Sequence, residues 1–216
     1  RGPFSTAFTA HNARGGDRVL LHVVLRSALE RAGLAEEFQK ALTAAVTLKH
    51  PGIVRVLAYG STASFEWFAT QAVEPRMRLS AILNERGPIT GDALIALVTQ
   101  TADVLRYAHR AGVPHGHLSP STVFLNDEGR VCVSEFCTRR VLYLLRGNQL
   151  RAAKRKGDAD EVATPEPLMR HDHLSLALLI HECLAGQALV TTGIESGVTG
   201  PGAQIQLSDA FGDLEK

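Results

Sequence analysis

The chain contains only three cysteines, Cys132, Cys137 and Cys183, among its 216 residues. Their number is odd, and their spacing differs from that of zinc sites and from the disulfide frameworks of small secreted proteins. We therefore expect reduced, buried thiols. They predict a cytoplasmic location, either of the whole protein or of the cytoplasmic part of a larger one.

An excess of charge of one sign and long hydrophobic runs are lacking as well. The 23 basic residues balance 22 acidic ones and leave a formal charge of +1, so the total charge does not indicate a nucleic acid or an anionic membrane as a partner. No run of about 18 apolar residues is present, and no charged leader precedes an apolar segment. We expect neither a membrane span nor a signal peptide within this chain.

What the chain does contain is a normal globular composition, with 45% hydrophobic and 21% charged residues, which suffices for one domain or two small lobes. The first part alternates in the manner of strands, and helical spacing dominates after Pro75. The patterns predict a hairpin over 4–25, strands over 53–60, 66–73, 122–125 and 130–136, and helices over 35–48, 78–87, 90–110 and 172–186. This order indicates an α+β fold with a small β-rich lobe and a larger helical one.

Residues 138–165 break this periodicity. Seven basic residues lie between Arg139 and Lys156, and the acidic run Asp158–Glu161 follows. Such a composition is typical of an exposed loop, and residues 139–156 are also a candidate docking surface for an acidic partner.

Several motifs resemble, in the right order, those of a bacterial-type Ser/Thr protein kinase domain. The run 115–136 resembles the catalytic loop, the hairpin after it and the metal-binding strand. The segment 48–60 resembles the turn after helix C with the next strand, 164–166 the end of the activation segment, and 172–186 helix F. The resemblance covers roughly residues 2–186. It implies a protein-kinase-like bilobal fold with an N-lobe at 1–74, a truncated C-lobe at 75–186, and a loop or tail at 187–216 where further C-lobe helices would be missing.

The resemblance also implies altered chemistry, because five positions that serve phosphoryl transfer in this family carry other residues. His22 replaces the strand lysine that holds the phosphates, and Ala41 replaces the helix C glutamate that pairs with it. His117 replaces the catalytic aspartate, and Thr122 the asparagine that ligates a second Mg²⁺. Glu135 replaces the aspartate of the metal-binding triplet. We therefore expect no catalytic residue and no metal site, with Glu135 as a weak candidate ligand.

The positions of the nucleotide pocket are changed in size. Leu20 stands where the family has a small alanine, and Phe124 stands where it has the leucine beneath the adenine. Overpacking of a site costs about 1–3 kcal/mol, so we expect the protein to fill its own adenine slot. The degenerate pocket comprises Gly2, Phe4, Ala7, Leu20, Phe124 and Ser134. No cofactor is expected, and any binding of ATP with Mg²⁺ is expected to be weak.

Four residues match architectural positions of the family. His115 and Phe136 match the hydrophobic spine that links the lobes, Asp172 the helix F aspartate that holds the catalytic loop, and Glu166 the activation-segment anchor. The pairs 115/117 and 171/173 have a spacing that can bind zinc. His115, however, matches a spine position, and His171 and His173 lie on either side of the structural Asp172. Both matches favour a structural role.

Our main hypothesis from the sequence is a pseudokinase, not an enzyme, that binds or regulates a protein partner or an attached domain without phosphoryl transfer. One alternative is a divergent ATP-dependent Ser/Thr protein kinase, or another phosphoryl or nucleotidyl transferase, with His117 as base and Glu135 as sole metal ligand. A third hypothesis is a nucleotide-sensing pseudokinase that binds ATP without turnover.

Overall fold

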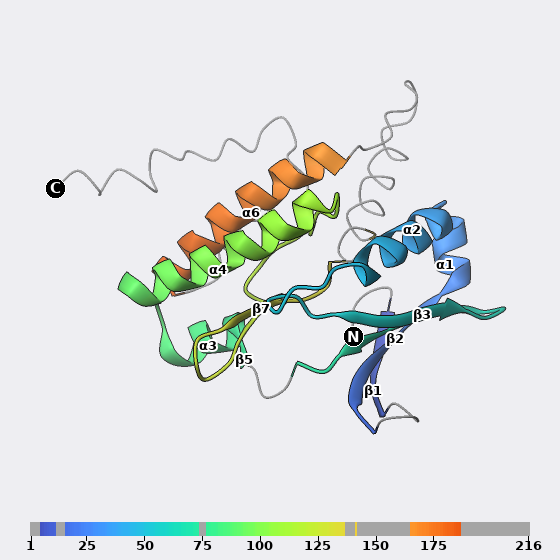
Figure 1. The fold of residues 1–216 in the computed structure, drawn as a ribbon, viewed down its shortest axis with the longest axis horizontal. Coiled ribbons are helices and arrows are strands. Elements are labelled where there is room, and N and C mark those ends of the chain that lie inside the picture. The colour runs from blue at the N-terminus through green and yellow to red at the C-terminus, as the bar shows by residue number, and fades with distance from the viewer. Residues whose placement is uncertain (1–4, 12–15, 74–76, 137–140, 142–164, 187–216) are drawn as a thin grey trace.

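The computed structural model describes residues 5–11, 16–73, 77–136, 141 and 165–186 (Figure 1). Gly2, Phe4, Cys137, the segment 187–216 and all of 139–156 except Val141 lie outside the described residues. The domain boundaries at 74/75 and 186/187 stay predictions.

The N-lobe is built on a four-stranded antiparallel sheet in the order β1-β2-β4-β3. Its strands are β1 (Ser5–His11), β2 (Arg18–Leu25), β3 (Val56–Ser61) and β4 (Phe65–Gln71). The predicted hairpin and the two later strands of this lobe are therefore confirmed. The ladder places His22 opposite Ala7 on one side and opposite Phe68 on the other.

Two helices lie against this sheet, α1 (Arg26–Arg31) and α2 (Ala35–Val46). The apolar face of α2 is buried on the sheet, where Phe38 meets Phe68 edge to face with ring centroids 6.2 Å apart. The sequence predicted α2 but not α1. Six residues are too few to show a helical period, and α1 ends at Arg31, followed by Ala32 and the positive φ of Gly33.

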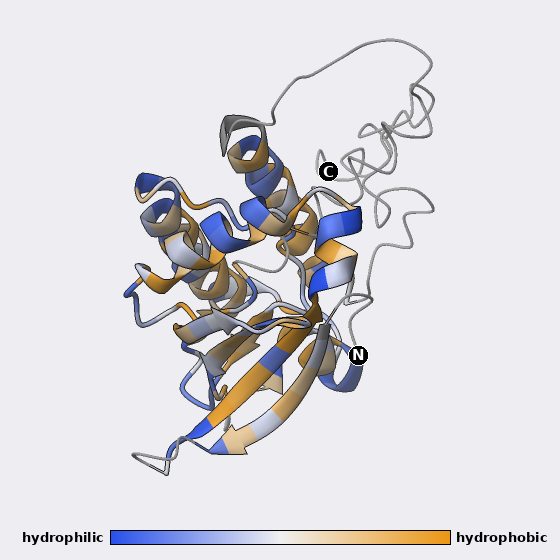
Figure 2. Cartoon of the chain, turned by 90° about the vertical axis from the view of Figure 1, so that its right-hand side faces the viewer, coloured by the Kyte–Doolittle hydropathy of each residue, from blue (hydrophilic) through white to orange (hydrophobic). Residues whose placement is uncertain are grey.

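In the described residues the C-lobe consists mainly of the helices α3 (Leu79–Arg86), α4 (Gly91–Arg110) and α6 (Pro165–Ala185). A small sheet, β5-β6-β7, contains β5 (Met77–Arg78), β6 (Val123–Leu125) and β7 (Val131–Val133). Helices α4 and α6 lie side by side (Figure 1) and share a core with Leu105, Leu179 and Cys183. Figure 2 shows hydrophobic residues along the strands and a mixture of both kinds along the helices. The predicted α+β fold with a β-rich lobe and a helical lobe is confirmed.

The structure adds detail at three predicted element ends of the C-lobe. Helix α4 begins at Gly91, one residue after the predicted start, and the side chain of Thr90 before it makes no capping hydrogen bond. In the predicted turn, Asn126 Oδ1 accepts hydrogen bonds from the backbone N–H groups of Glu128 at 3.1 Å and Arg130 at 2.8 Å. Helix α6 begins at Pro165, seven residues before the predicted start at 172. Proline is tolerated in the first helical turn, where its missing N–H would be unpaired in any case.

The two lobes are joined through Val133 of β7. Its N–H donates to Gly52 O at 2.8 Å, and its carbonyl accepts from the N–H of Val54 at 2.9 Å. A Cβ on Gly52 would lie 2.4 Å from Val104 Cγ2, so only glycine fits without a shift of α4. This link fixes the N-lobe sheet above β7 and positions the space between them.

Two chemical expectations from composition can be compared with the described residues. Cys132 and Cys183 are buried, free thiols, and burial raises the pKa of Cys183 to about 11, with a smaller contribution from Glu182. None of the described helices is long and apolar enough to span a membrane.

Candidate functional site

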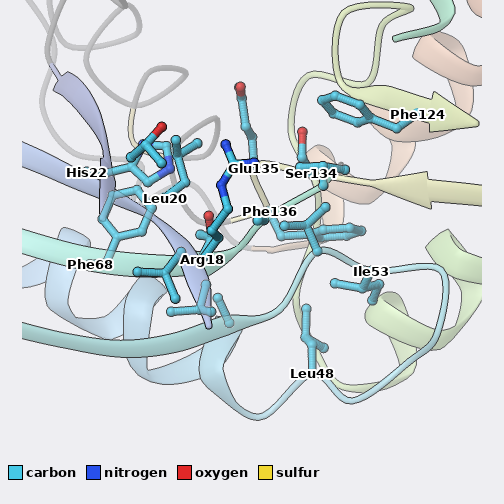
Figure 3. A pocket seen from close by; sticks show the side chains of 18 of the residues that line it. Arg18, Leu20, His22, Leu48, Ile53, Phe68, Phe124, Ser134, Glu135 and Phe136 are labelled. Carbon is cyan, nitrogen blue, oxygen red and sulfur yellow. The ribbon is translucent and has the colours of Figure 1, made fainter. Parts of the chain in front are cut away.

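A cavity of about 310 Å³ lies between the lobes. Figure 3 shows Leu20, His22 and Phe68 on one side of it and Phe124 on the other, with Ser134, Glu135 and Phe136 between them. The structure therefore brings together the predicted pocket residues Leu20, Phe124 and Ser134 with the altered positions His22 and Glu135. Ala7, opposite His22 in the sheet, is exposed, and Thr9 lines the cavity from that strand.

Leu20 and Phe124, which we expected to fill the adenine slot, both line the wall of this cavity. The filling of the slot stays a prediction. Phe124 is buried and packs laterally against Val54 and Cys132. The guanidinium carbon of Arg78 lies 5.1 Å from the centroid of its ring. Phe124 therefore packs on these neighbours and also lines the cavity.

His22 presents an uncharged ring to the cavity. The imidazole stacks on Phe68 with centroids 4.4 Å apart and an angle of 1° between the planes. Burial lowers the pKa of His22, and the nearby negative charge of Glu135 opposes this shift. At neutral pH the ring is thus a neutral hydrogen-bonding group. Ala41, on α2, is buried in the N-lobe core with Phe68 and supplies no carboxylate to pair with His22.

Glu135 has a left-handed backbone conformation, with φ of 70°. Among the described residues it is the only non-glycine residue with a positive φ. Such a conformation costs about 1–3 kcal/mol and is concentrated at functional sites. Figure 3 shows its side chain at the cavity, next to Ser134.

The loop from His115 to Thr122 is held in place from helix α6. The buried carboxylate of Asp172 accepts hydrogen bonds from the backbone N–H groups of His115 at 2.7 Å and Gly116 at 2.6 Å, and from His109 Nε2 at 2.7 Å. His115 Nε2 in turn donates to Ser134 O at 2.8 Å, and its ring meets Phe136 edge to face at 4.8 Å. These contacts fix the loop relative to the cavity floor. They also use ring nitrogens that a zinc site over 115–117 would need.

Thr122 and His117 occupy this loop with different surroundings. The Thr122 hydroxyl is buried, accepts from the N–H of Ser119 at 3.1 Å and donates to Ser119 O at 2.9 Å. It therefore closes a turn of the loop and is not available as a metal ligand. His117 is half-buried, and its backbone N–H donates to His115 Nδ1 at 3.2 Å.

The remaining predicted positions do not come to the cavity in the described part of the chain. Glu166 lies in the first turn of α6, and its side chain is outside the described residues. His171 Nδ1 contacts Ser175 Oγ at 3.3 Å, and His173 packs against His109. The described residues contain no group of three or more side chains suited to hold a metal ion.

Sequence reasoning missed two basic residues that line the cavity, Arg18 and Arg78. Arg18 could have been found, because side chains alternate along a strand and positions 18, 20 and 22 share one face. Arg78 gave no such signal, since β5 has only two residues.

Residues 1–169 match the family described as protein tyrosine and serine/threonine kinase. Similar curated proteins include the probable serine/threonine-protein kinase PknB of Lactococcus lactis, which is 25% identical over 191 residues, 87% of this chain and 30% of that protein. The probable serine/threonine-protein kinase pknA2 of Bifidobacterium longum is 28% identical over 138 residues, 62% of this chain and 18% of its own length. CBL-interacting protein kinase 4 of Oryza sativa subsp. japonica is 27% identical over 140 residues, 63% of this chain and 30% of its own. The chain thus spans less than a third of each of these relatives.

These matches correct one expectation from the sequence. The prediction that the chain is not an enzyme is wrong, because the matched family is one of enzymes and all three relatives are named as protein kinases. The resemblance to a Ser/Thr kinase domain with bacterial relatives is confirmed. Since the match extends over 169 of 216 residues, the chain belongs to the protein tyrosine and serine/threonine kinase family.

Proposed function

We propose that the chain is a divergent ATP-dependent Ser/Thr protein kinase that binds its nucleotide in the cavity between the lobes. The observation that carries this proposal is the open cavity of about 310 Å³, in which residues of both lobes converge. Small-molecule sites typically measure about 300–1,000 Å³ and combine apolar walls with a few polar groups. The kinase names of the relatives support the same reaction.

The apolar part of the cavity suits a planar base. Leu20 faces it from the N-lobe and Phe124 from the C-lobe, and Val54 and Val73 extend this surface. A base between these side chains would be removed from water on both faces, which favours binding by about 25 cal/mol for each Å² of apolar surface that is buried.

The polar part of the cavity suits a phosphate chain with one metal ion. Mg²⁺ is commonly held by one or two carboxylates together with substrate phosphates and water, and Glu135 supplies one such carboxylate at the cavity. Mg²⁺ bound there neutralises charge on the phosphates. Because the Thr122 hydroxyl is engaged with Ser119, we infer that Glu135 is the sole protein ligand and that the metal is held weakly.

The acceptor side of the reaction is assigned to the loop that Asp172 holds. His117 lies two residues after His115, whose backbone is bonded to Asp172. In this proposal His117 takes the proton from the hydroxyl of a protein acceptor, a role that contributes about 10²–10⁴-fold in rate. The acceptor is a protein partner or an attached domain, and a cytoplasmic location is part of the proposal.

The test is transfer of phosphate from ATP with Mg²⁺ to a library of Ser- and Thr-containing peptides, read by mass spectrometry. Glu135→Gln keeps the size of the side chain and removes its charge, so we expect transfer to fall by about 100-fold or more. Glu128→Gln is the matched control, because Glu128 is an exposed carboxylate on the β6–β7 turn, paired with Arg130 at 2.9 Å. It should leave the rate unchanged.

Two results would contradict the proposal. One is the absence of both ATP binding and transfer in the parent protein, and the other is transfer that Glu135→Gln leaves intact. Binding of ATP without transfer to any acceptor would favour the nucleotide-sensing hypothesis over the kinase.

A further inference from the structure

Arg78 holds a fixed positive charge at the wall of the cavity. It lies opposite Phe124 in the β5–β6 ladder, and its guanidinium carbon lies 5.1 Å from the centroid of that ring. Its Nη1 donates a hydrogen bond of 3.0 Å to Ser121 O, in the loop that precedes β6. Two contacts on different segments therefore hold a long side chain that would otherwise be free to rotate.

Both contacts are with neutral groups, a carbonyl oxygen and an aromatic ring. They position the guanidinium and leave its charge uncompensated, and no carboxylate pairs with it in the part of the chain that the structure describes. A guanidinium has five N–H donors. Donors beyond the one that Ser121 occupies can serve an anion.

The inner end of the cavity offers no comparable charge. The ring of His22 lies flat on Phe68, and the residue that α2 contributes to the lining is Ala45. Of the cavity-lining residues that the structure describes, the only basic ones besides His22 are Arg18 and Arg78. Arg18 extends from the β2 side, and both arginines are exposed. Arg78 stands on the opposite lobe with Phe124.

We propose that Arg78 is a specificity-determining residue that makes the cavity select phosphorylated nucleosides over nucleosides. Its guanidinium donates to phosphate oxygens of the bound nucleotide, while Phe124 beside it contacts the apolar part of the ligand. Charge-assisted hydrogen bonds between arginine and phosphate are about twice as strong as neutral ones, and the planar donor fork matches phosphate geometry. This inference rests on the proposed function, because it takes the cavity to be the nucleotide site.

The test is isothermal titration of the parent protein and of variants with adenosine, ADP and ATP. EDTA is present throughout, so that a metal ion at Glu135 does not contribute. We expect the parent to bind ATP at least about tenfold more tightly than adenosine, which corresponds to about 1.4 kcal/mol. Arg78→Ala should remove this difference by weakening ATP and ADP, with adenosine unchanged. Arg78→Lys keeps the charge without the planar fork and should restore part of the difference.

Arg130→Ala is the matched control. Arg130 is an exposed arginine on the β6–β7 turn, paired with Glu128, and its loss should leave all three affinities unchanged. Because Arg78 also holds Phe124 and Ser121, adenosine affinity and the melting temperature of each variant report any loosening of the wall.

Every other outcome of these titrations contradicts the proposed role of Arg78. An equal loss of adenosine and ATP affinity in Arg78→Ala would make Arg78 a packing residue. A difference between ATP and adenosine that survives in Arg78→Ala, or that Arg18→Ala removes instead, would overturn the inference and leave the nucleotide site standing. No binding of any of the three ligands by the parent would overturn both the inference and the proposed function.

Discussion

Asp172 accepts a hydrogen bond of 2.7 Å from the backbone N–H of His115, 57 residues earlier in the chain. The same carboxylate accepts from the N–H of Gly116 at 2.6 Å, and it is fully buried. A side chain in the core of the C-lobe thereby fixes the backbone of the loop that carries His117.

Replacement of Asp172 by alanine should be strongly destabilising, because two buried N–H groups and His109 would lose their acceptor. Loss of a buried, charge-assisted network costs about 3–5 kcal/mol. Urea denaturation followed by circular dichroism measures the change. Asp92→Ala, in the exposed first turn of α4, is the control and should cost well under half of this. Equal effects of the two changes would argue against the role of Asp172.

Glu135 should be a site where stability and function conflict, because its φ of 70° suits glycine better than glutamate. Glu135→Gly relieves the strain of a left-handed residue but adds chain entropy to the unfolded state, so we expect a net gain of up to about 1 kcal/mol. Glu135→Gln removes the same charge and keeps the strain, and should not be stabilised in this way. Melting temperatures of the three proteins, measured together with phosphate transfer, test this. A Glu135→Gly protein less stable than Glu135→Gln would contradict it.

His22 should make stability sensitive to acid. Burial lowers its pKa in the folded protein below the ordinary value of 6.5, so the unfolded state binds a proton first as the pH falls. This residue therefore costs no stability above about pH 6.5, and stability declines as the pH falls below that value toward the lower pKa of the folded state. His22→Phe keeps an aromatic ring on Phe68 and removes the titrating group.

The measurement is the difference in melting temperature between pH 7.5 and pH 5.5. We expect a smaller difference in His22→Phe than in the parent protein. His11→Phe, an exposed position on β1, serves as the control and should keep the difference of the parent. An identical pH dependence in all three proteins would show that His22 does not titrate differently on folding.

Gly52→Ala should destabilise the junction of the lobes, since the added Cβ would lie 2.4 Å from Val104 Cγ2. Overpacking of this kind costs about 1–3 kcal/mol. The double variant Gly52→Ala, Val104→Ala removes the colliding methyl group and should cost less than the sum of the two single changes. Chemical denaturation of the four proteins of this cycle gives the coupling. If the losses in unfolding free energy of the two single variants simply add in the double variant, the methyl group of the new alanine does not collide with Val104.

The sequence predicted the elements whose patterns are long or whose turns have distinctive chemistry. Helix α4 has twenty residues of regular spacing. In the turn between β6 and β7, the side chain of Asn126 accepts two backbone hydrogen bonds. The short elements α1 and β5 lack a readable period, because their place in the fold is set by the segments they pack on rather than by their own composition.

The candidate site was predicted in part of its membership and not in its shape. The order of the motifs led to Leu20, His22, Phe124 and Glu135, and these residues do line one cavity. Side-chain size alone suggested a closed slot, whereas Phe124 packs with Val54 and Cys132 while it lines the cavity. The contact with Val54 depends on a residue distant in sequence, and so does the contact between Arg78 and Ser121. Neither can be read from local spacing.

The two hydrogen bonds of Val133 to the chain on either side of Ile53 have a mechanical consequence. They join the lobes at Val133, two residues before Glu135. This bridge of two hydrogen bonds is therefore expected to act as a pivot for motion of one lobe relative to the other. Displacement grows with distance from a pivot, and Leu20 and His22 of strand β2 lie across the cavity from Phe124 (Figure 3). We therefore expect rocking about this bridge to widen or narrow the gap above Glu135 by moving Leu20 and His22 more than the carboxylate.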